Sequence, residues 1–274
     1  MPQYDYSNSL QENVGSYNFF ENEMKHLNIY TLDLINNIFN DFIEFHGDRL
    51  FGDDPSIVAG IALLKDIPVT IISQVRGKSI DEQIKCNFSM TRPEGYRKTL
   101  RLMRQAEKFR RPIICFIDTI GAYPSADSEA RGQQNAISQN IISMLGLKVP
   151  IISIIVGNAC SGGALALCVS DRILMLEGAS FTVISPRAYA EIVWKDTTKY
   201  TEAKKLLQIS SKDLVDEGIV DLIINISAND HKQQSNVFDT IQMLIIKEIK
   251  TLQKQKIPKL LKERTKKFRN IGLI

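Results

Sequence analysis

Two junctions in the sequence place glycine turns directly after apolar strands. At the first, the Val- and Ile-rich run 149–156 leads into Gly157-Asn-Ala-Cys-Ser-Gly-Gly163, and small apolar residues then continue as a helix to Val169. A strand, a tight turn and a helix in that order aim backbone N–H groups and the positive end of a helix dipole at one point. Such a point can hold a negatively charged oxygen, so the first hypothesis is an oxyanion site. The alternative is that Gly162 and Gly163 only let the helix pack closely on its strand.

The second junction lies upstream. Residues 112–118 form an apolar strand, residues 119–124 form a turn that contains Gly121, and a helical stretch runs from 128 to about 146. Neighbouring strands of a parallel sheet open their loops on the same edge, so both turns are expected to face one crevice at the carboxyl ends of the strands. This arrangement favours a ligand site over close packing alone.

The elements that would position these turns follow from apolar periodicity. Residues 57–64 and 67–75 are β-rich runs two residues apart, as in a hairpin. A helix is expected from Pro93 to Phe109, because proline suits a first helical position and apolar residues then recur at helical spacing. Its other face carries Arg97, Lys98, Arg101, Arg104 and Lys108. Strands are further expected at 172–177, 181–184 and 219–224, and helices at 186–194, at 201–207 and from a Ser210 or Ser211 cap to Gly218.

This order of strand, strand and helix predicts an α/β fold. No GxGxxG or GxxxxGK[ST] motif occurs, so nucleotide cofactors held by those loops are not expected. The length favours one domain with helical ends: an N-terminal helical segment at 1–54, a main domain at 55–226 and a basic C-terminal helical extension at 227–274. In the N-terminal segment an apolar stripe can dock on the main domain or on a partner, namely Ile29, Leu32, Ile35, Phe39, Phe42 and Phe45.

Composition sets further limits. The cysteines at 86, 115, 160 and 168 form no CxxC pair, so neither a disulfide framework nor a zinc site is expected. The beginning of the chain has no apolar leader pattern, and no segment approaches eighteen uninterrupted apolar residues, which predicts a soluble cytoplasmic protein. Net charge is +3, yet residues 247–269 hold ten Lys or Arg against two Glu. Apolar residues at helical spacing there favour a solvated basic face over contact with nucleic acid or an acidic partner.

Several short motifs together resemble one family. They are H-G-D-R at 46–49, R-P-E-G-Y-R-K at 92–98, F-I-D-T at 116–119, G-A-Y-P at 121–124 and S-G-G-A-L at 161–165. From about 40 to 225 the sequence is similar to the carboxyltransferase alpha subunit of bacterial acetyl-CoA carboxylase. The resemblance implies a crotonase/ClpP-like superhelix of ββα units with helical N- and C-terminal extensions.

The resemblance also implies a reaction and its participants. Carboxyl would pass from carboxybiotin on a carrier protein to acetyl-CoA and give malonyl-CoA, the first committed step of fatty acid synthesis. The implied partners are a zinc-ribbon beta subunit, in an alpha2beta2 assembly with the active site between the subunits, the biotin carboxyl carrier protein and acetyl-CoA. Biotin is the implied cofactor. No metal in this chain, no nucleic acid and no membrane are expected.

Site residues follow from the family pattern by position. In the family, backbone N–H groups stabilise the negative charge on the ureido oxygen when carboxybiotin loses its carboxyl group. The implied donors are Ala159, Cys160, Gly162 and Gly163. The implied substrate-binding residues are Gly121, Ala122, Tyr123 and Ser161.

The sequence departs from the family pattern at this loop. Where the family has G-E-G-G-S-G-G, residues 157–163 carry Ala159 and Cys160 in place of two glycines. A residue with a Cβ resists positive φ and blocks the close approach of a ligand to the backbone. Besides the acetyl-CoA enzyme, this leaves open a divergent paralogue that acts on another acyl-CoA, or a non-catalytic scaffold subunit.

Three further features each allow more than one interpretation: Ser161, the basic helix at 92–111 and His46. A ClpP-like serine hydrolase with Ser161 as nucleophile needs a base within reach, and none of the three histidines lies in the strand–helix core after Ser161, so a helix N-cap role is simpler. The basic helix at 92–111 can meet phosphates of coenzyme A, although a solvated face with ion pairs is favoured. His46 is interpreted as a turn residue, with Asp48 and Arg49 free to pair.

Overall fold

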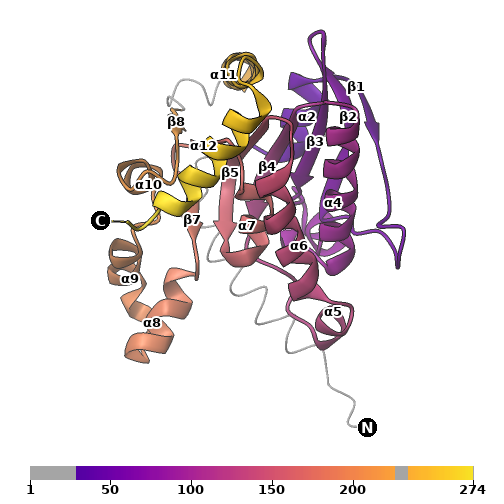
Figure 1. Cartoon of the computed structure of the whole chain (residues 1–274). Helices are drawn as coiled ribbons and strands as arrows, with labels where there is room; N and C mark the ends of the chain where they lie inside the picture. Colours follow the sequence, from indigo (N-terminus) through magenta and orange to yellow (C-terminus); the bar gives the residue numbers. More distant parts are fainter. Residues whose placement is uncertain (1–28, 226–233, 274) are drawn as a thin grey trace.

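One mixed sheet organises the chain, and the computed structural model describes residues 29–225 and 234–273 of it (Figure 1). The sheet has eight strands, seven of them in the order β1-β2-β3-β4-β5-β6-β8. The eighth, β7, pairs with the last three residues of β5, after the part of β5 that pairs with β6. The strands are β1 (Asn40–Glu44), β2 (Ile57–Leu64), β3 (Ile67–Gln74), β4 (Ile113–Thr119), β5 (Ile151–Cys160), β6 (Arg172–Leu176), β7 (Ser180–Thr182) and β8 (Leu222–Ile224).

The direction of the strands confirms the expected hairpin and the expected parallel part. β2 and β3 are antiparallel neighbours, and Leu64 pairs with Ile67 across the two-residue turn. β3, β4, β5, β6 and β8 are all parallel. Every residue of β5 is buried, as is typical of a central parallel strand covered on both faces. The carboxyl ends of β4 and β5 therefore open on the same edge.

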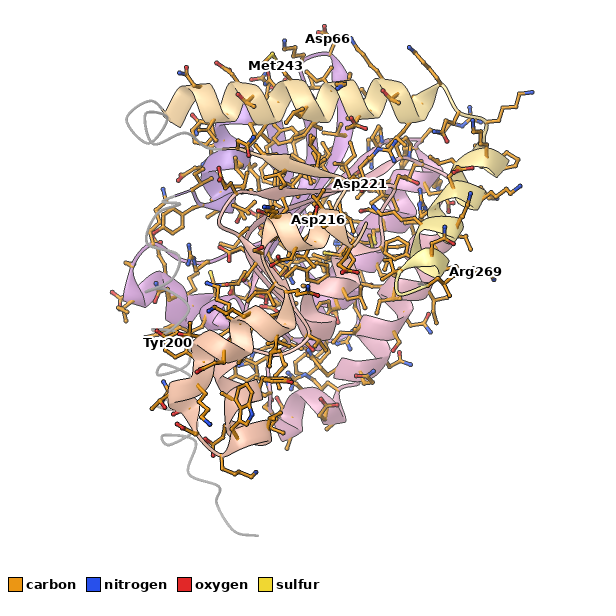
Figure 2. The ribbon with its side chains drawn as sticks, turned by 90° about the vertical axis from the view of Figure 1, so that its left-hand side faces the viewer. Asp66, Tyr200, Asp216, Asp221, Met243 and Arg269 are labelled. Atoms are coloured by element: carbon orange, nitrogen blue, oxygen red, sulfur yellow. The ribbon has the colours of Figure 1, made fainter. Side chains whose placement is uncertain are left out.

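Helices cover the sheet. They are α2 (Thr31–Ile38), α3 (Ile80–Lys85), α4 (Pro93–Lys108), α5 (Ala126–Ala130), α6 (Gln133–Gly146), α7 (Ser161–Cys168), α8 (Pro186–Trp194), α9 (Tyr200–Leu207), α10 (Ser211–Asp216), α11 (Gln234–Gln253) and α12 (Ile257–Asn270). Short 3-10 turns lie at Asn87–Ser89 and Thr197–Lys199. In Figure 1, α4, α6 and α7 lie next to one another in front of the sheet. Figure 2 shows Met243 of α11 near the top of the view and Tyr200 of α9 at its lower left.

Two expected helices are shorter than the sequence pattern indicates. The apolar stripe of the N-terminal segment is helical only to Ile38, and residues 40–44 form β1 at the edge of the sheet. The helix expected from 128 to about 146 is divided into α5 and α6, because Gly132 between them has a φ of 84°. The helices at 186–194 and after Ser210 are confirmed, and Ser210 forms a capping box with Asp213. None of the described helices is long and apolar enough to cross a membrane.

The basic C-terminal helix α12 is fixed by a buried arginine. Arg264 donates from Nε and Nη2 to the two carboxylate oxygens of Asp171, at 2.8 and 2.6 Å, and from Nη1 to the main-chain oxygens of Met144 and Leu147. Asp171 also accepts from the N–H of Ile151, at the start of β5. Arg264 is fully buried, so this cation belongs to the interior and not to the solvated face expected for this segment.

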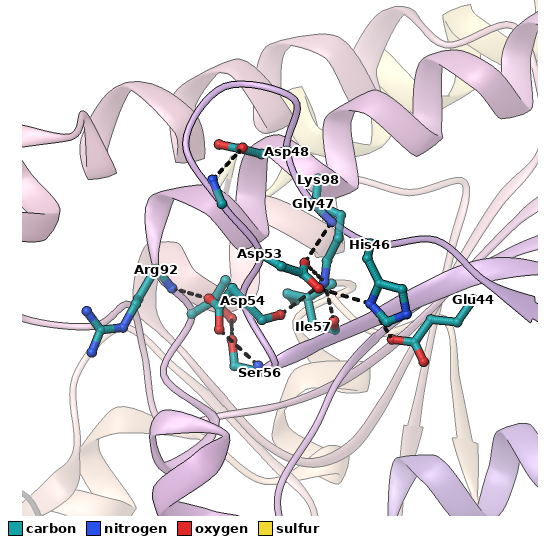
Figure 3. Close-up of polar contacts among 12 residues, drawn as sticks. Glu44, His46, Gly47, Asp48, Asp53, Asp54, Ser56, Ile57, Arg92 and Lys98 are labelled. Carbon is teal, nitrogen blue, oxygen red and sulfur yellow. Dashed lines mark hydrogen bonds and ion pairs between the residues drawn. The ribbon is translucent and has the colours of Figure 1, made fainter.

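The loop between β1 and β2 is held by the cations of α4 (Figure 3). Lys98 is fully buried and donates to Asp53 Oδ1 at 2.5 Å and to the main-chain oxygens of Asp54 and Ile57 at 3.0 and 2.7 Å. Arg101 donates to the main-chain oxygen of Gly47 at 2.9 Å. The solvated face predicted for this helix is therefore wrong for Lys98, because its ammonium group lies inside the protein and satisfies three loop oxygens at once.

Asp48 organises the tip of the same loop. Its Oδ1 accepts from the N–H groups of Leu50, Phe51 and Gly52, and its Oδ2 accepts from Arg97 Nε at 2.7 Å. Partial desolvation raises the pKa of Asp48, but these hydrogen bonds outweigh it and lower the pKa to about 2. The expected pairing of Asp48 with Arg49 is replaced by the pairing with Arg97.

Replacement of the buried Lys98 should lower the free energy of unfolding more than replacement of an exposed cation on the same helix. In Lys98→Met the carboxylate of Asp53 and two carbonyl groups lose their common donor, so we expect the free energy of unfolding to fall by about 3–5 kcal/mol. Arg104→Met, on the exposed face of the same helix, is the matched control and should change it by less than about 0.5 kcal/mol. Urea denaturation measures both. Equal losses in the two variants would contradict the assigned role of Lys98.

The hydrogen bonds of Asp48 also predict that the stability of the folded chain depends on pH. The pKa of Asp48 is lower in the folded chain than its ordinary value of 3.8, so its stabilising contribution is complete above that value and is lost as pH falls from about 4 to about 2. Wild type should therefore be more stable than Asp48→Asn at pH 7, and the difference should shrink over this acid range. Urea denaturation at stepped pH tests this. A difference that stays constant down to pH 2 would contradict it.

Candidate functional site

The first glycine junction is tighter than its sequence predicts. β5 does not end at Val156 but runs on to Cys160, and α7 begins at the next residue. Ala159 pairs with Thr119 of β4 on one side and with Phe181 of β7 on the other. The turn is thus reduced to Ser161, whose φ of 58° is unusual for a residue with a side chain. Ala159 and Cys160 belong to the sheet ladder, and their part as N–H donors stays a prediction.

The start of α7 leaves its first N–H groups without a side-chain cap. Cys160 is the N-cap residue and makes no side-chain hydrogen bond to the helix. The N-cap role predicted for Ser161 is therefore wrong, because Ser161 is already the first helical residue. The N–H groups of Gly162 and Gly163 lie in the first turn, where no carbonyl group of the helix can accept them. They are at the positive end of the helix dipole, as an anion site requires.

The two glycine turns meet through their backbones. A Cβ placed on Gly163 would lie 2.6 Å from the carbonyl carbon of Gly121 and 2.7 Å from the nitrogen of Ala122. Such a distance shows that the start of α7 is packed directly on the turn after β4. Gly121 itself has a φ of 136°, which favours glycine, and its N–H donates to Thr119 Oγ1 at 3.1 Å. The two turns therefore meet at the carboxyl edge of the sheet, and that they face one common crevice stays a prediction.

Two buried side chains anchor the contact from behind. Gln74, at the end of β3, donates from Nε2 to the main-chain oxygen of Gly163 at 3.0 Å. The hydroxyl of Tyr96, on α4, donates to the same oxygen at 3.3 Å. These bonds fix the orientation of the peptide after Gly163. Neither residue is among those expected at the site from the sequence, although Tyr96 belongs to one of the motifs that carry the family resemblance.

A mainly apolar cavity of about 490 Å³ opens at the start of α7. Ser161 and Gly162 line it, and the remaining lining comes from α7, β6, β7, α9, α10 and α12 and from the segments directly after β7, α10 and α12. Its apolar side chains include Leu165, Ile173, Phe181, Val183, Leu207, Leu214, Ile219, Phe268 and Ile271. Neither Ala159 nor Cys160 belongs to the lining. The two side chains that depart from the family pattern therefore do not fill this space.

Tyr123, in the turn after β4, contacts the side chain of Arg92. Ala122 pairs with Thr91, and the N–H of Tyr123 donates to the main-chain oxygen of Thr91 at 3.0 Å. The guanidinium carbon of Arg92 lies 4.0 Å from the centre of the Tyr123 ring, within the range of a cation–π contact. Tyr123 is therefore held against α4 at the border of the site.

A serine nucleophile would need a base that the described site lacks. Ser161 is exposed on a strained backbone, as a nucleophile at a strand-to-helix turn would be. His46 lies in the β1–β2 loop, with its ring against Asp53 at 3.0 Å and Glu44 at 3.6 Å, while His26 and His231 fall outside the described residues. Across residues 29–225 and 234–273, no group of His, Cys, Asp and Glu side chains is arranged to hold a metal ion.

Replacement of the two adjacent glycines should have opposite effects. Gly163→Ala places a Cβ against the backbone of Gly121 and Ala122, so we expect it to lower the free energy of unfolding by about 1–3 kcal/mol. Gly162→Ala meets only Ile137 Cγ2, at 3.6 Å, and should be neutral or slightly stabilising in a helix. Thermal and urea denaturation compare the pair. Equal effects would contradict the backbone contact.

The sequence matches relatives of one family over most of its length. The family model described as "Acetyl co-enzyme A carboxylase carboxyltransferase-like" matches residues 23–272. An acetyl-coenzyme A carboxylase carboxyl transferase subunit alpha of Halalkalibacterium halodurans is 49% identical over 88% of this chain and 75% of its own. The subunit alpha of Clostridium botulinum (strain Alaska E43) is 48% identical over 88% of each chain. A Clostridium tetani protein described as subunits beta/alpha is 50% identical, and the chain spans only 42% of its length.

Solved structures share the fold at low sequence identity. A Pseudomonas malonate decarboxylase hetero-tetramer superimposes with a TM-score of 0.62 at 15% identity, over 78% of this chain and 86% of that one. Transcarboxylase 12S superimposes with a TM-score of 0.61 at 17% identity, over 76% of this chain and 40% of that one. These likenesses confirm the crotonase-like α/β fold. By sequence, the chain belongs to the family of acetyl-CoA carboxylase carboxyltransferase alpha subunits.

Proposed function

We propose that the chain is the alpha half of a biotin-dependent carboxyltransferase that moves a carboxyl group to acetyl-CoA and gives malonyl-CoA, for fatty acid synthesis in the cytoplasm. Its family and the geometry of the α7 start support this. The observation that carries the proposal is the uncapped start of α7, which contacts Gly121 and Ala122 through Gly163 and lines an apolar cavity through Ser161 and Gly162.

The residues of the site suit a ligand with an apolar body and one oxygen that gains negative charge. Biotin, bound through its carrier protein, would supply the carboxyl group from its ureido ring. The N–H groups of Gly162 and Gly163 would then hold the ureido oxygen, and removal of one such donor typically costs about 3–4 kcal/mol of transition-state stabilisation. The apolar lining beside Gly162 would exclude water from this oxygen and strengthen its hydrogen bonds. Gly121, Ala122 and Tyr123 would border the acyl-CoA side.

A second subunit would complete the site. The Clostridium tetani relative carries beta and alpha in one chain, and this chain spans less than half of it. The malonate decarboxylase that shares the fold is a hetero-tetramer. We infer a beta subunit carrying a zinc ribbon, an alpha2beta2 assembly, and transient binding of the biotin carboxyl carrier protein.

Three other functions have weaker support. Ala159 and Cys160 would favour a non-catalytic scaffold, but neither lines the cavity. The exposed Ser161 and its positive φ would favour a serine hydrolase, but the one histidine among the described residues lies in the β1–β2 loop. A carboxyltransferase that acts on a longer acyl-CoA uses the same donors and differs only in the acceptor.

The proposal is tested with the purified chain, its beta subunit, the carboxylated carrier protein and acetyl-CoA. We expect malonyl-CoA to form only when both subunits are present, and Gly163→Ala to lower kcat by about 100-fold because one oxyanion donor is displaced. Thr251→Ala, at an exposed position of α11, is the control and should stay within about threefold of wild type.

Three outcomes would contradict this function. Turnover that appears only after Ala159→Gly and Cys160→Gly would identify a scaffold. Labelling of Ser161 by a fluorophosphonate, together with loss of activity in Ser161→Ala, would identify a hydrolase. Turnover with a longer acyl-CoA but not with acetyl-CoA would identify a paralogue.

A further inference from the structure

The register between β4 and β5 contains an irregularity directly below the site. Ile117 pairs with Ile155, but Thr119 pairs with Ala159, so a single residue of β4 lies opposite residues 156–158 of β5. A bulge of this kind bends a strand and changes the direction of the chain after it, and bulges are common next to active sites. Here it redirects the last residues of β5 toward the start of α7.

The residue opposite the bulge is Asp118, which is buried. Its Oδ1 accepts from the N–H of Asn158 at 3.1 Å. Gly157 leaves the space for this carboxylate, because a Cβ there would lie 2.4 Å from Oδ1. Gly157 is therefore required because it makes room for the carboxylate of Asp118, and it lies in β5 before the turn. The sequence pattern of an oxyanion loop does not reveal that Gly157 is needed to make room for the buried Asp118.

Arg76 follows the neighbouring strand β3 and balances the charge. Its Nε lies 3.3 Å from Oδ2 of Asp118, and its guanidinium lies 5.4 Å from the centre of the Tyr30 ring. Burial raises the pKa of Asp118, and the guanidinium opposes that rise. An unbalanced carboxylate behind the turns would repel negative charge on a bound oxygen, because a charge acts over a longer range in a low-dielectric interior.

Asp118 therefore connects the beginnings of both turns. Its own strand continues through Thr119 into the Gly121 turn, and the strand segment that it holds continues through Asn158 into Ser161. We propose that Asp118 and Arg76 are positioning residues for carboxyl transfer, which set the bulge of β5 so that the N–H groups of Gly162 and Gly163 converge. Neither residue touches substrate. The catalytic part of this inference rests on the proposed function, whereas its geometric part does not.

The chain offers a matched control at the other end of the same strand. Asp171 and Arg264 form a second buried pair, and Asp171 accepts from the N–H of Ile151, where β5 begins. Both pairs join an aspartate that holds β5 to an arginine. Arg264 makes two hydrogen bonds to Asp171, whereas Arg76 lies 3.3 Å from Asp118 as an ion pair, and only the Asp118 pair lies at the carboxyl edge. Substitution of either aspartate should lower the stability, but only substitution of Asp118 should also lower the catalytic rate.

The experiment compares variants of the reconstituted enzyme. Asp118→Asn should lower kcat by about 100-fold with KM for acetyl-CoA changed less than twofold, because displaced donors act on the transition state. Gly157→Ala should behave in the same way, since its methyl group displaces the carboxylate. Asp171→Asn should lower the unfolding temperature yet keep kcat within about twofold of wild type. Arg76→Lys, which retains the charge, should keep more activity than Arg76→Met.

A second readout needs no activity. In the ¹⁵N-labelled chain, Asp118→Asn and Gly157→Ala should shift the amide resonances of Ala122, Gly162 and Gly163, and Asp171→Asn should leave them in place. Unshifted resonances in Asp118→Asn, or equal kcat losses in Asp118→Asn and Asp171→Asn, would overturn the inference. If wild type forms no malonyl-CoA, the proposed function fails, and the amide comparison still decides whether Asp118 positions the turns.

Discussion

The close packing of Gly163 on the peptide between Gly121 and Ala122 is the constraint on which the rest of the site depends. Two parallel strands deliver their loops to the same edge of a sheet, but the backbones come into contact only where a side chain is absent. Gln74 and Tyr96 then hold the carbonyl group of Gly163 from behind. The uncapped start of α7 is thereby fixed in place before any ligand arrives. Preorganised N–H donors are a large source of electrostatic catalysis where they face a developing negative charge.

Buried charges serve geometry throughout this chain. Lys98 holds the β1–β2 loop, Arg264 holds α12 against the start of β5, and Arg76 balances Asp118 at its end. A buried ion pair adds little net stability compared with apolar packing, because desolvation offsets the attraction, although removal of one partner is costly. These pairs instead provide a defined position for segments that apolar contacts alone would leave free to slide.

Local periodicity and turn chemistry were enough to predict several parts of the fold from the sequence. The hairpin of β2 and β3, the helix after Pro93 and the capped helix after Ser210 depend on patterns within single segments. The end of β5 could not be predicted in this way, because residues 158–160 are held in the sheet by pairing with β7 and by the carboxylate of Asp118, which lie elsewhere in the chain. The burial of Lys98 could not be predicted for the same reason: its partners lie more than forty residues earlier in the chain. The glycines indicate where the site lies, whereas the side chains that hold it come together only in three dimensions.

The most direct test of this account is a titration of the ¹⁵N-labelled complex of this chain and its beta subunit with free biotin, followed by the amide resonances. We expect the resonances of Gly162 and Gly163 to move together with one dissociation constant, and that of Ile152, near the other end of β5, to move least. A biotin-dependent shift confined to other parts of the chain, or no shift at saturating biotin, would contradict an oxyanion site at the start of α7.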